Sequence, residues 1–182
     1  LMPLLRATQG DRPRIVNLSS GYAHLGRIDF DDLNAAHGYR AFTAYGQSKL
    51  AMLIFALELQ RRSDDGGWGL CATAAHPGYA RTDLIANGPG TSSGISTTMM
   101  HMIAPMFSQS AADGALPQLY AATASDVVPG GYYGPSHMFE MRGPPKIARL
   151  PGTARDLSTA RRLWAESERL TGVSFPLALA AA

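Results

Sequence analysis

The chain of 182 residues is long enough for one domain with a sizeable core, and its 46% hydrophobic and 16% charged residues are typical of a globular protein. A formal net charge of +2 with scattered basic residues argues against a nucleic-acid partner, and the single cysteine, Cys71, excludes a disulfide framework within the chain. Because no run of about 18 apolar residues could span a membrane, we expect a cytoplasmic protein.

The first predicted elements are the end of an apolar helix at residues 1–7 and a strand at residues 14–20. The strand is rich in β-branched residues and ends in Ser19 and Ser20, as expected of a buried parallel strand whose carboxyl end reaches a site. In open α/β sheets, ligands bind at that end. Residues 21–42 are predicted to form a long loop with at most one short helical turn.

A helix is predicted to begin after Thr43, its expected N-cap, and to continue to Arg62. Tyr45 and Lys49 share a face of its first turns, because residues i and i+4 do. An ammonium beside a phenol lowers the phenol's pKa, so the pair can serve as a general acid/base. The alternative is a solvated face, since Tyr-x-x-x-Lys also occurs by chance. The broad apolar stripe favours a homodimer or homotetramer, with a buried core helix as the alternative.

A second buried strand is predicted at residues 68–75, so that strand, helix and strand form a right-handed βαβ crossover. Cys71 lies inside this strand and is expected to be a buried thiol. Pro77 and Gly78 follow the strand, and the glycine lets the backbone approach a planar ligand closely. The turn is therefore a candidate shelf for a cofactor.

The second half of the chain supplies a possible lid and two more helices. Residues 85–108 become rich in methionine and are predicted to form an apolar lid over a substrate, with a loose surface helix as the alternative. Helices are predicted at 110–123 and 156–171, and a short strand at 130–135. The first of these helices places Leu116 and Leu119 on its apolar face. No cluster with metal-ligand spacing is present in the sequence, so no metal is expected.

Three motifs in this order resemble the short-chain dehydrogenase/reductase family. They are Asn17-Leu18-Ser19-Ser20 at a strand end, Tyr45-x-x-x-Lys49 at a helix start, and Pro77-Gly78-x-x-x-Thr82 after the next strand. The resemblance covers the family's carboxyl-terminal portion only and is greatest to its retinol-dehydrogenase-like subgroup. It implies a single α/β domain over residues 1–182, an incomplete Rossmann-like doubly wound parallel sheet that lacks its amino-terminal βαβ units. The family's glycine-rich turn belongs upstream of Leu1.

The resemblance also implies an NAD- or NADP-dependent oxidoreductase that transfers a hydride between a nicotinamide and an alcohol or ketone, here a hydrophobic one. Ser20, Tyr45 and Lys49 would be catalytic: Tyr45 exchanges a proton with the substrate oxygen, Lys49 holds the ribose hydroxyls, and Ser20 stabilises the alkoxide. The residues expected to bind the cofactor are Leu18, Ser19, Tyr45, Lys49, Pro77, Gly78 and Thr82. The alternative is an inactive fragment that serves as an oligomerisation or interaction module.

Overall fold

The computed structural model describes residues 2–8, 12–80 and 108–175. Its elements in chain order are α1 (Met2–Arg6), β1 (Arg14–Leu18), η1 (Gly21–Leu25), α2 (Ala41–Asp65), β2 (Cys71–Ala75), α5 (Ala111–Thr123), β3 (Tyr132–His137), β4 (Arg142–Ile147), η2 (Gly152–Arg155) and α6 (Leu157–Thr171), where η marks a 3₁₀ helix. The strands form one sheet in the order β1-β2-β3-β4, in which β1, β2 and β3 are parallel and β4 is antiparallel.

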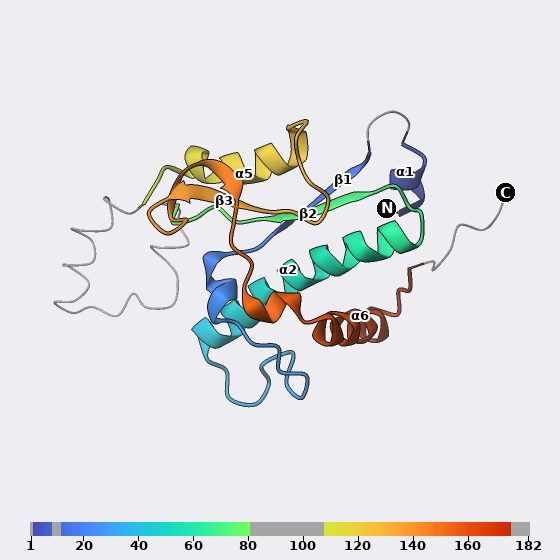
Figure 1. Cartoon of the computed structure of the whole chain (residues 1–182). Coiled ribbons are helices and arrows are strands. Elements are labelled where there is room, and N and C mark those ends of the chain that lie inside the picture. The colour runs from blue at the N-terminus through green and yellow to red at the C-terminus, as the bar shows by residue number, and fades with distance from the viewer. Residues whose placement is uncertain (1, 9–11, 81–107, 176–182) are drawn as a thin grey trace.

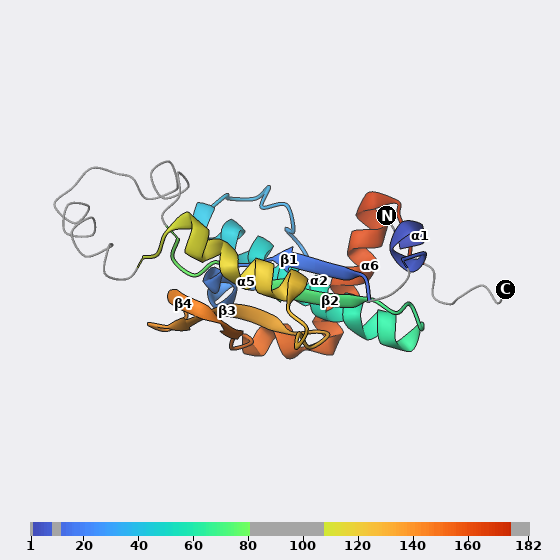
Figure 2. The same cartoon turned by 90° about the horizontal axis from the view of Figure 1, so that it is seen from above.

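Helices cover both faces of this sheet. Helix α5 lies over one face, whereas α2 and α6 lie on the other (Figure 1). Seen from above, α5 lies over the sheet roughly along the direction of the strands, and the β3–β4 hairpin lies at one side of the sheet (Figure 2). Helices on both faces of a mainly parallel sheet are the doubly wound α/β architecture, so the predicted fold class is confirmed. Within the described residues, no helix has the length and apolarity needed to cross a membrane.

The two strands of the predicted βαβ unit differ in burial. All five residues of β2 are buried, because the strand lies between β1 and β3 and is covered on both faces. Strand β1 pairs only with β2 within the described part of the chain, and its residues are half-buried or, at Leu18, exposed. The expectation of a buried first strand was therefore wrong, because an edge strand has one neighbour instead of two.

Helix α2 is longer than predicted and is not capped by Thr43. It begins at Ala41 after Arg40, which makes no side-chain capping bond, so Thr43 lies inside the first turn. The loop before the helix contacts its first turns instead. The side-chain amide of the buried Gln47 accepts a hydrogen bond from the Asp29 N–H at 2.7 Å and donates one to the Leu33 carbonyl oxygen at 3.2 Å. This side chain ties the long loop to the beginning of the helix.

Helix α5 has the predicted bounds but turns a different face inward. Gly114, Pro117 and Ala121 are buried, whereas Leu116 and Leu119 are 40% and 55% exposed. The reason is close packing, because a Cβ added to Gly114 would lie only 2.6 Å from the Cβ of Ala80. The helix approaches the turn after β2 through its smallest residues, so the predicted apolar face was wrong.

The hairpin of β3 and β4 was only half predicted. Strand β4 contains Pro144 and Pro145 and therefore did not resemble a strand, but it is an edge strand, where missing N–H donors are tolerated.

Helix α6 begins after the N-cap Asp156 and ends at Gly172, which is left-handed with φ +66°. Residues 85–107 of the predicted lid lie outside the described residues.

Candidate active site

Ser20 follows β1 at the carboxyl end of the parallel strands. The ladder continues through Ser19, whose N–H donates to the carbonyl oxygen of Ala75 at 2.7 Å. Ser20 then caps η1, since its Oγ accepts a hydrogen bond from the Tyr22 N–H at 3.3 Å. The Tyr132 hydroxyl donates to the carbonyl oxygen of Ser20 at 3.2 Å. The Tyr22 N–H thus holds the Ser20 side chain and the Tyr132 hydroxyl holds its backbone, while the Ser20 hydroxyl proton has no acceptor among the described residues.

Tyr45 and Lys49 lie one turn apart near the start of α2, and both are half-buried. Lys49 Nζ is 5.7 Å from the centroid of the Tyr45 ring, so the two side chains do share a face. Lys49 Nζ also donates to the carbonyl oxygen of Leu18 at 3.3 Å, and the Lys49 carbonyl oxygen accepts a hydrogen bond from Ser19 Oγ at 2.8 Å. These bonds join the first turns of the helix to the end of β1.

Tyr22 connects the serine segment to Tyr45. Its ring meets the Tyr45 ring edge-on, with centroids 5.6 Å apart and an angle of 74°. The segment around η1 also packs directly on α2, because a Cβ added to Gly26 would lie 2.4 Å from the carbonyl oxygen of Gly46. Tyr22 was not predicted from the sequence, where the only signal for it is an aromatic residue two positions after Ser20. It is the side chain that sets the Tyr45 ring beside the serine turn.

A cavity of about 650 Å³ opens beside Ser20. It is lined by the segment after β1, the turn after β2 and the β3–β4 hairpin. Ser20 and Gly78 both line it, so the structure brings these two predicted residues to one space. Tyr45 and Lys49 are not among its lining residues, and Thr82 lies outside the described part of the chain.

The turn at Gly78 has a packing role in addition to the predicted one. Gly78 is left-handed, with φ +63°, and a Cβ placed on it would lie 2.4 Å from the carbonyl oxygen of Met141. The Tyr79 N–H donates to the same carbonyl at 2.8 Å. The amide of Gln109 donates to the Pro77 carbonyl oxygen at 2.8 Å and also binds the hairpin. The glycine therefore lets the β3–β4 hairpin close against the turn.

His76, at the end of β2, is a buried member of the cavity wall that the sequence analysis did not single out. It is 2% exposed, and burial lowers its pKa although nearby Glu140 opposes this. Its Nδ1 accepts a hydrogen bond from the Gly78 N–H at 3.3 Å, which assigns the proton of the neutral ring to Nε2. Nε2 lies 3.5 Å from Glu140 Oε2. The only sequence signal is a histidine between a strand and a Pro-Gly turn.

Tyr132, a buried residue of β3, contacts both His76 and Ser20. Its ring centroid lies 5.1 Å from that of His76, and its hydroxyl holds the Ser20 carbonyl. Burial raises the pKa of Tyr132 far above its ordinary value. The phenol therefore stays neutral and acts as a fixed hydrogen-bond donor rather than as an acid or base of the site.

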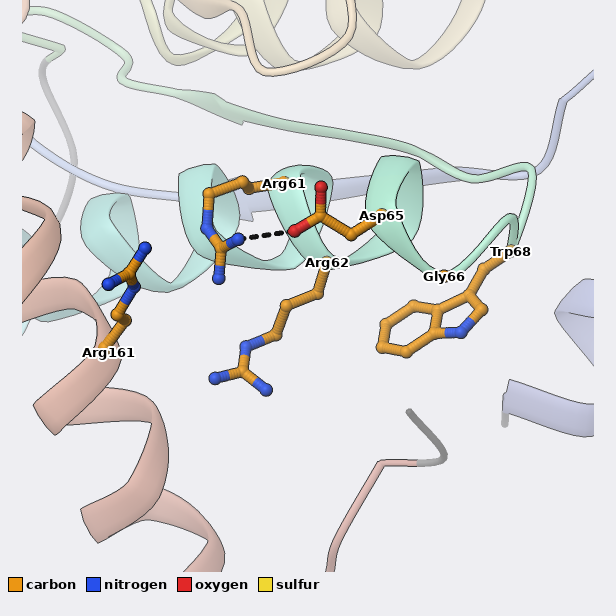
Figure 3. Close-up of a pocket in the computed structure, with 6 residues that line it drawn as sticks. All are labelled: Arg61, Arg62, Asp65, Gly66, Trp68 and Arg161. Carbon is orange, nitrogen blue, oxygen red and sulfur yellow. Dashed lines mark hydrogen bonds and ion pairs between the residues drawn. The ribbon is translucent and has the colours of Figure 1, made fainter. Parts of the chain in front are cut away.

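A second cavity, of about 310 Å³, lies where the end of α2 faces α6 (Figure 3). Arg61 bonds to Glu58 at 2.7 Å and to Asp65 at 2.5 Å, and Arg62 bonds to Glu58 at 2.7 Å. Burial favours the protonated form of Glu58, but the hydrogen bonds from the two arginines outweigh it and lower the pKa. The cavity is therefore part of a structural ion-pair network, to which Arg161 of α6 adds a further positive charge, and it is distant from the Ser20 cavity in the fold.

Comparison with known proteins gives a consistent set of relatives, although no family model matches the chain. It is 41% identical over 167 residues to retinol dehydrogenase 13 of Homo sapiens and 36% identical over 175 residues to polyprenol dehydrogenase of Mus musculus. These alignments cover 90% and 94% of the chain but 47% and 49% of the two relatives. The chain spans about half the length of the curated relatives it matches.

A solved structure supports the same relationship. The crystal structure of an uncharacterised protein from Mycobacterium Paratuberculosis is 36% identical and superposes with a TM-score of 0.68. The match covers 90% of this chain and 52% of that one. The sheet and its covering helices thus recur in an independent structure, again as about half of a longer chain.

Proposed function

Since the chain belongs to the short-chain dehydrogenase/reductase family and aligns with about half the length of its retinol dehydrogenases, we propose that it supplies the catalytic groups of an NAD- or NADP-dependent oxidoreductase. Ser20, Tyr45 and Lys49 are the proposed catalytic residues. The substrate is an alcohol or the corresponding carbonyl compound. The relatives' names specify retinol and polyprenol, both long apolar alcohols, and we extend that class to this chain as a hydrophobic alcohol.

The observation that carries the proposal is a set of polar groups with unused hydrogen-bonding capacity around the end of β1. The Ser20 hydroxyl proton and the Tyr45 hydroxyl have no partner among the described residues. The Lys49 ammonium has three donors, of which one is used by the Leu18 carbonyl. Half-buried polar groups with unfilled capacity bind water, and a ligand that offers the same hydrogen bonds can displace it.

These free groups fit the nicotinamide end of a dinucleotide. The two remaining Lys49 donors would hold the ribose hydroxyls, and the backbone of Leu18 and Ser19 would lie alongside, with Pro77 and Gly78 at the turn after β2. When bound, the nicotinamide supplies or accepts the hydride at the substrate carbon. Lys49 would thereby place the cofactor and present a positive charge to the Tyr45 ring, 5.7 Å away.

The protein's own steps are a proton transfer and a hydrogen bond. As the phenolate, Tyr45 takes the proton of the alcohol oxygen and becomes the phenol, which returns that proton in the reductive direction. The Ser20 hydroxyl donates to the same oxygen as it acquires negative charge, with its side chain already held by the Tyr22 N–H and its backbone by the Tyr132 hydroxyl. The cavity beside Ser20 would receive the rest of the substrate.

Calorimetric titration of NADH and NADPH into the 182-residue chain tests the proposal. We expect binding of at least one dinucleotide, and about 10-fold weaker binding to a Lys49→Met variant, because charge-assisted hydrogen bonds are lost. An Arg169→Met variant on α6 serves as the control, since it removes an exposed cation elsewhere. Equal binding by both variants would refute the role of Lys49.

The alternative function is a non-catalytic interaction module that forms a homodimer or homotetramer through α2 and α6. It is favoured by exposed apolar side chains on α2, where Phe42 and Met52 are 51% and 41% exposed. A folded circular-dichroism spectrum without binding of either dinucleotide would support this alternative over the enzyme.

A further inference from the structure

The connection between β3 and β4 holds the least ordinary backbone of the described chain. Met138, Phe139 and Glu140 have φ values of +52°, +56° and +65°. None of them is a glycine, and L-residues normally visit this left-handed region singly rather than three in succession. Such conformations persist only where the surrounding structure enforces them, and they cluster at functional sites.

Glu140 provides much of that enforcement. Its Oε1 accepts a hydrogen bond from the Arg149 N–H at 2.9 Å, and its Oε2 lies 3.5 Å from Nε2 of the buried His76. Lys146 Nζ lies 3.8 Å from Oε1. The next residue is also held, because the Met141 carbonyl accepts the Tyr79 N–H at 2.8 Å. The left-handed turn is thus tied to β2, to the turn after β2 and to the chain after β4.

What this turn presents is an aromatic ring with almost no protein contact. Phe139 is 96% exposed, yet it lines the same cavity as Ser20. Leu25, from η1, also lines the cavity and is 81% exposed. A strained turn that is held through the Glu140 carboxylate, and that keeps a phenyl ring in water, gains nothing for folding. It does supply an apolar surface to a molecule entering the cavity.

We propose that Phe139 is a specificity-determining residue whose ring packs on the hydrocarbon part of the substrate, with Glu140 as the positioning residue that holds the turn. The inference rests on the proposed function, in which the substrate oxygen faces Ser20. Contact with Phe139 then increases the affinity for substrates whose hydrocarbon chain extends from Ser20 to the outer wall of the cavity. Short alcohols bind without reaching it.

The test compares the binding of 1-butanol and 1-octanol to the 182-residue chain by ligand-observed nuclear magnetic resonance. Because each buried methylene is worth about 4-fold in affinity, we expect Phe139→Ala to weaken octanol binding about 10-fold and butanol binding less than about 2-fold. Glu140→Gln removes the charge but keeps the shape, and should weaken octanol selectively by about 3-fold. Leu119→Ala, an exposed truncation on α5, is the control and should change neither.

A selective loss of octanol binding in both variants supports the inference, because a purely structural role of either residue would not depend on the length of the alcohol. Equal losses for the two alcohols, an equal loss in the control, or no binding of octanol to the unaltered chain would overturn it. NAD- and NADP-linked oxidation of octanol is measured in parallel. Absent turnover with intact length selectivity would refute the proposed function alone.

Discussion

Replacing Gly78 with alanine tests the packing of the cavity wall. The residue has φ +63°, a conformation that costs an L-residue about 1–2 kcal/mol. The added Cβ would also lie 2.4 Å from the Met141 carbonyl oxygen, a backbone atom that cannot rotate away. Overpacking of this kind costs about 1–3 kcal/mol. We therefore expect Gly78→Ala to lower the free energy of unfolding by about 3 kcal/mol.

Gly69→Ala is the matched control. Gly69 has a similar φ of +70°, but no atom lies within 4 Å of its added Cβ, so only the backbone cost of about 1 kcal/mol applies. Both variants are measured by urea denaturation followed by circular dichroism. The difference between them isolates the contact of the hairpin with the turn. Equal losses of stability would show that the hairpin does not close on Gly78, and the described cavity wall would be wrong.

Three further predictions concern buried and capping groups. Glu58→Gln should cost about 3 kcal/mol in urea denaturation, because it removes the buried carboxylate that Arg61 and Arg62 share and leaves Arg62 without an anionic partner among the described residues, while Arg61 keeps Asp65; a loss below about 1 kcal/mol would contradict this. Hydrogen bonds from Thr159 and Ser158 lower the pKa of Asp156 to about 2. The ionised carboxylate therefore stabilises the folded chain above the unfolded pKa near 4, and this contribution is lost as the pH falls through about 2. Asp156→Asn should keep the helix cap and remove this pH dependence of the urea midpoint. Burial raises the pKa of Cys71, so iodoacetamide should label it only when the chain unfolds, and labelling of the folded chain at neutral pH would show that the thiol is accessible.

Much of the fold could be predicted from local patterns. The helix predicted at 156–171 from its amphipathic pattern agrees to within one residue with α6, because a 3.6-residue period needs only neighbouring turns. The shared face of Tyr45 and Lys49 followed from helix geometry alone. The position of Ser20 at a strand end followed from the apolar run that precedes it. Each of these inferences needed only residues close together in the chain.

Features that depend on distant contacts could not be predicted in the same way. The buried face of α5 is set by how closely Gly114 approaches Ala80, which reverses the choice made from hydrophobicity. The pairing of His76 with Glu140 joins two strands' ends and leaves no periodic signal. For the same reason the left-handed turn at Phe139, which contains no glycine, could not be recognised from composition.

The measurement that tests the central claim most directly is the rate of NAD- or NADP-linked octanol oxidation by a Tyr45→Phe variant, with Tyr39→Phe, an exposed tyrosine in the loop before α2, as the control. Removing a general acid/base is expected to lower kcat by about 100-fold or more while octanol still binds. The control should turn over at the rate of the unaltered chain. A Tyr45→Phe variant that keeps most of that rate would contradict the assignment of proton transfer to Tyr45.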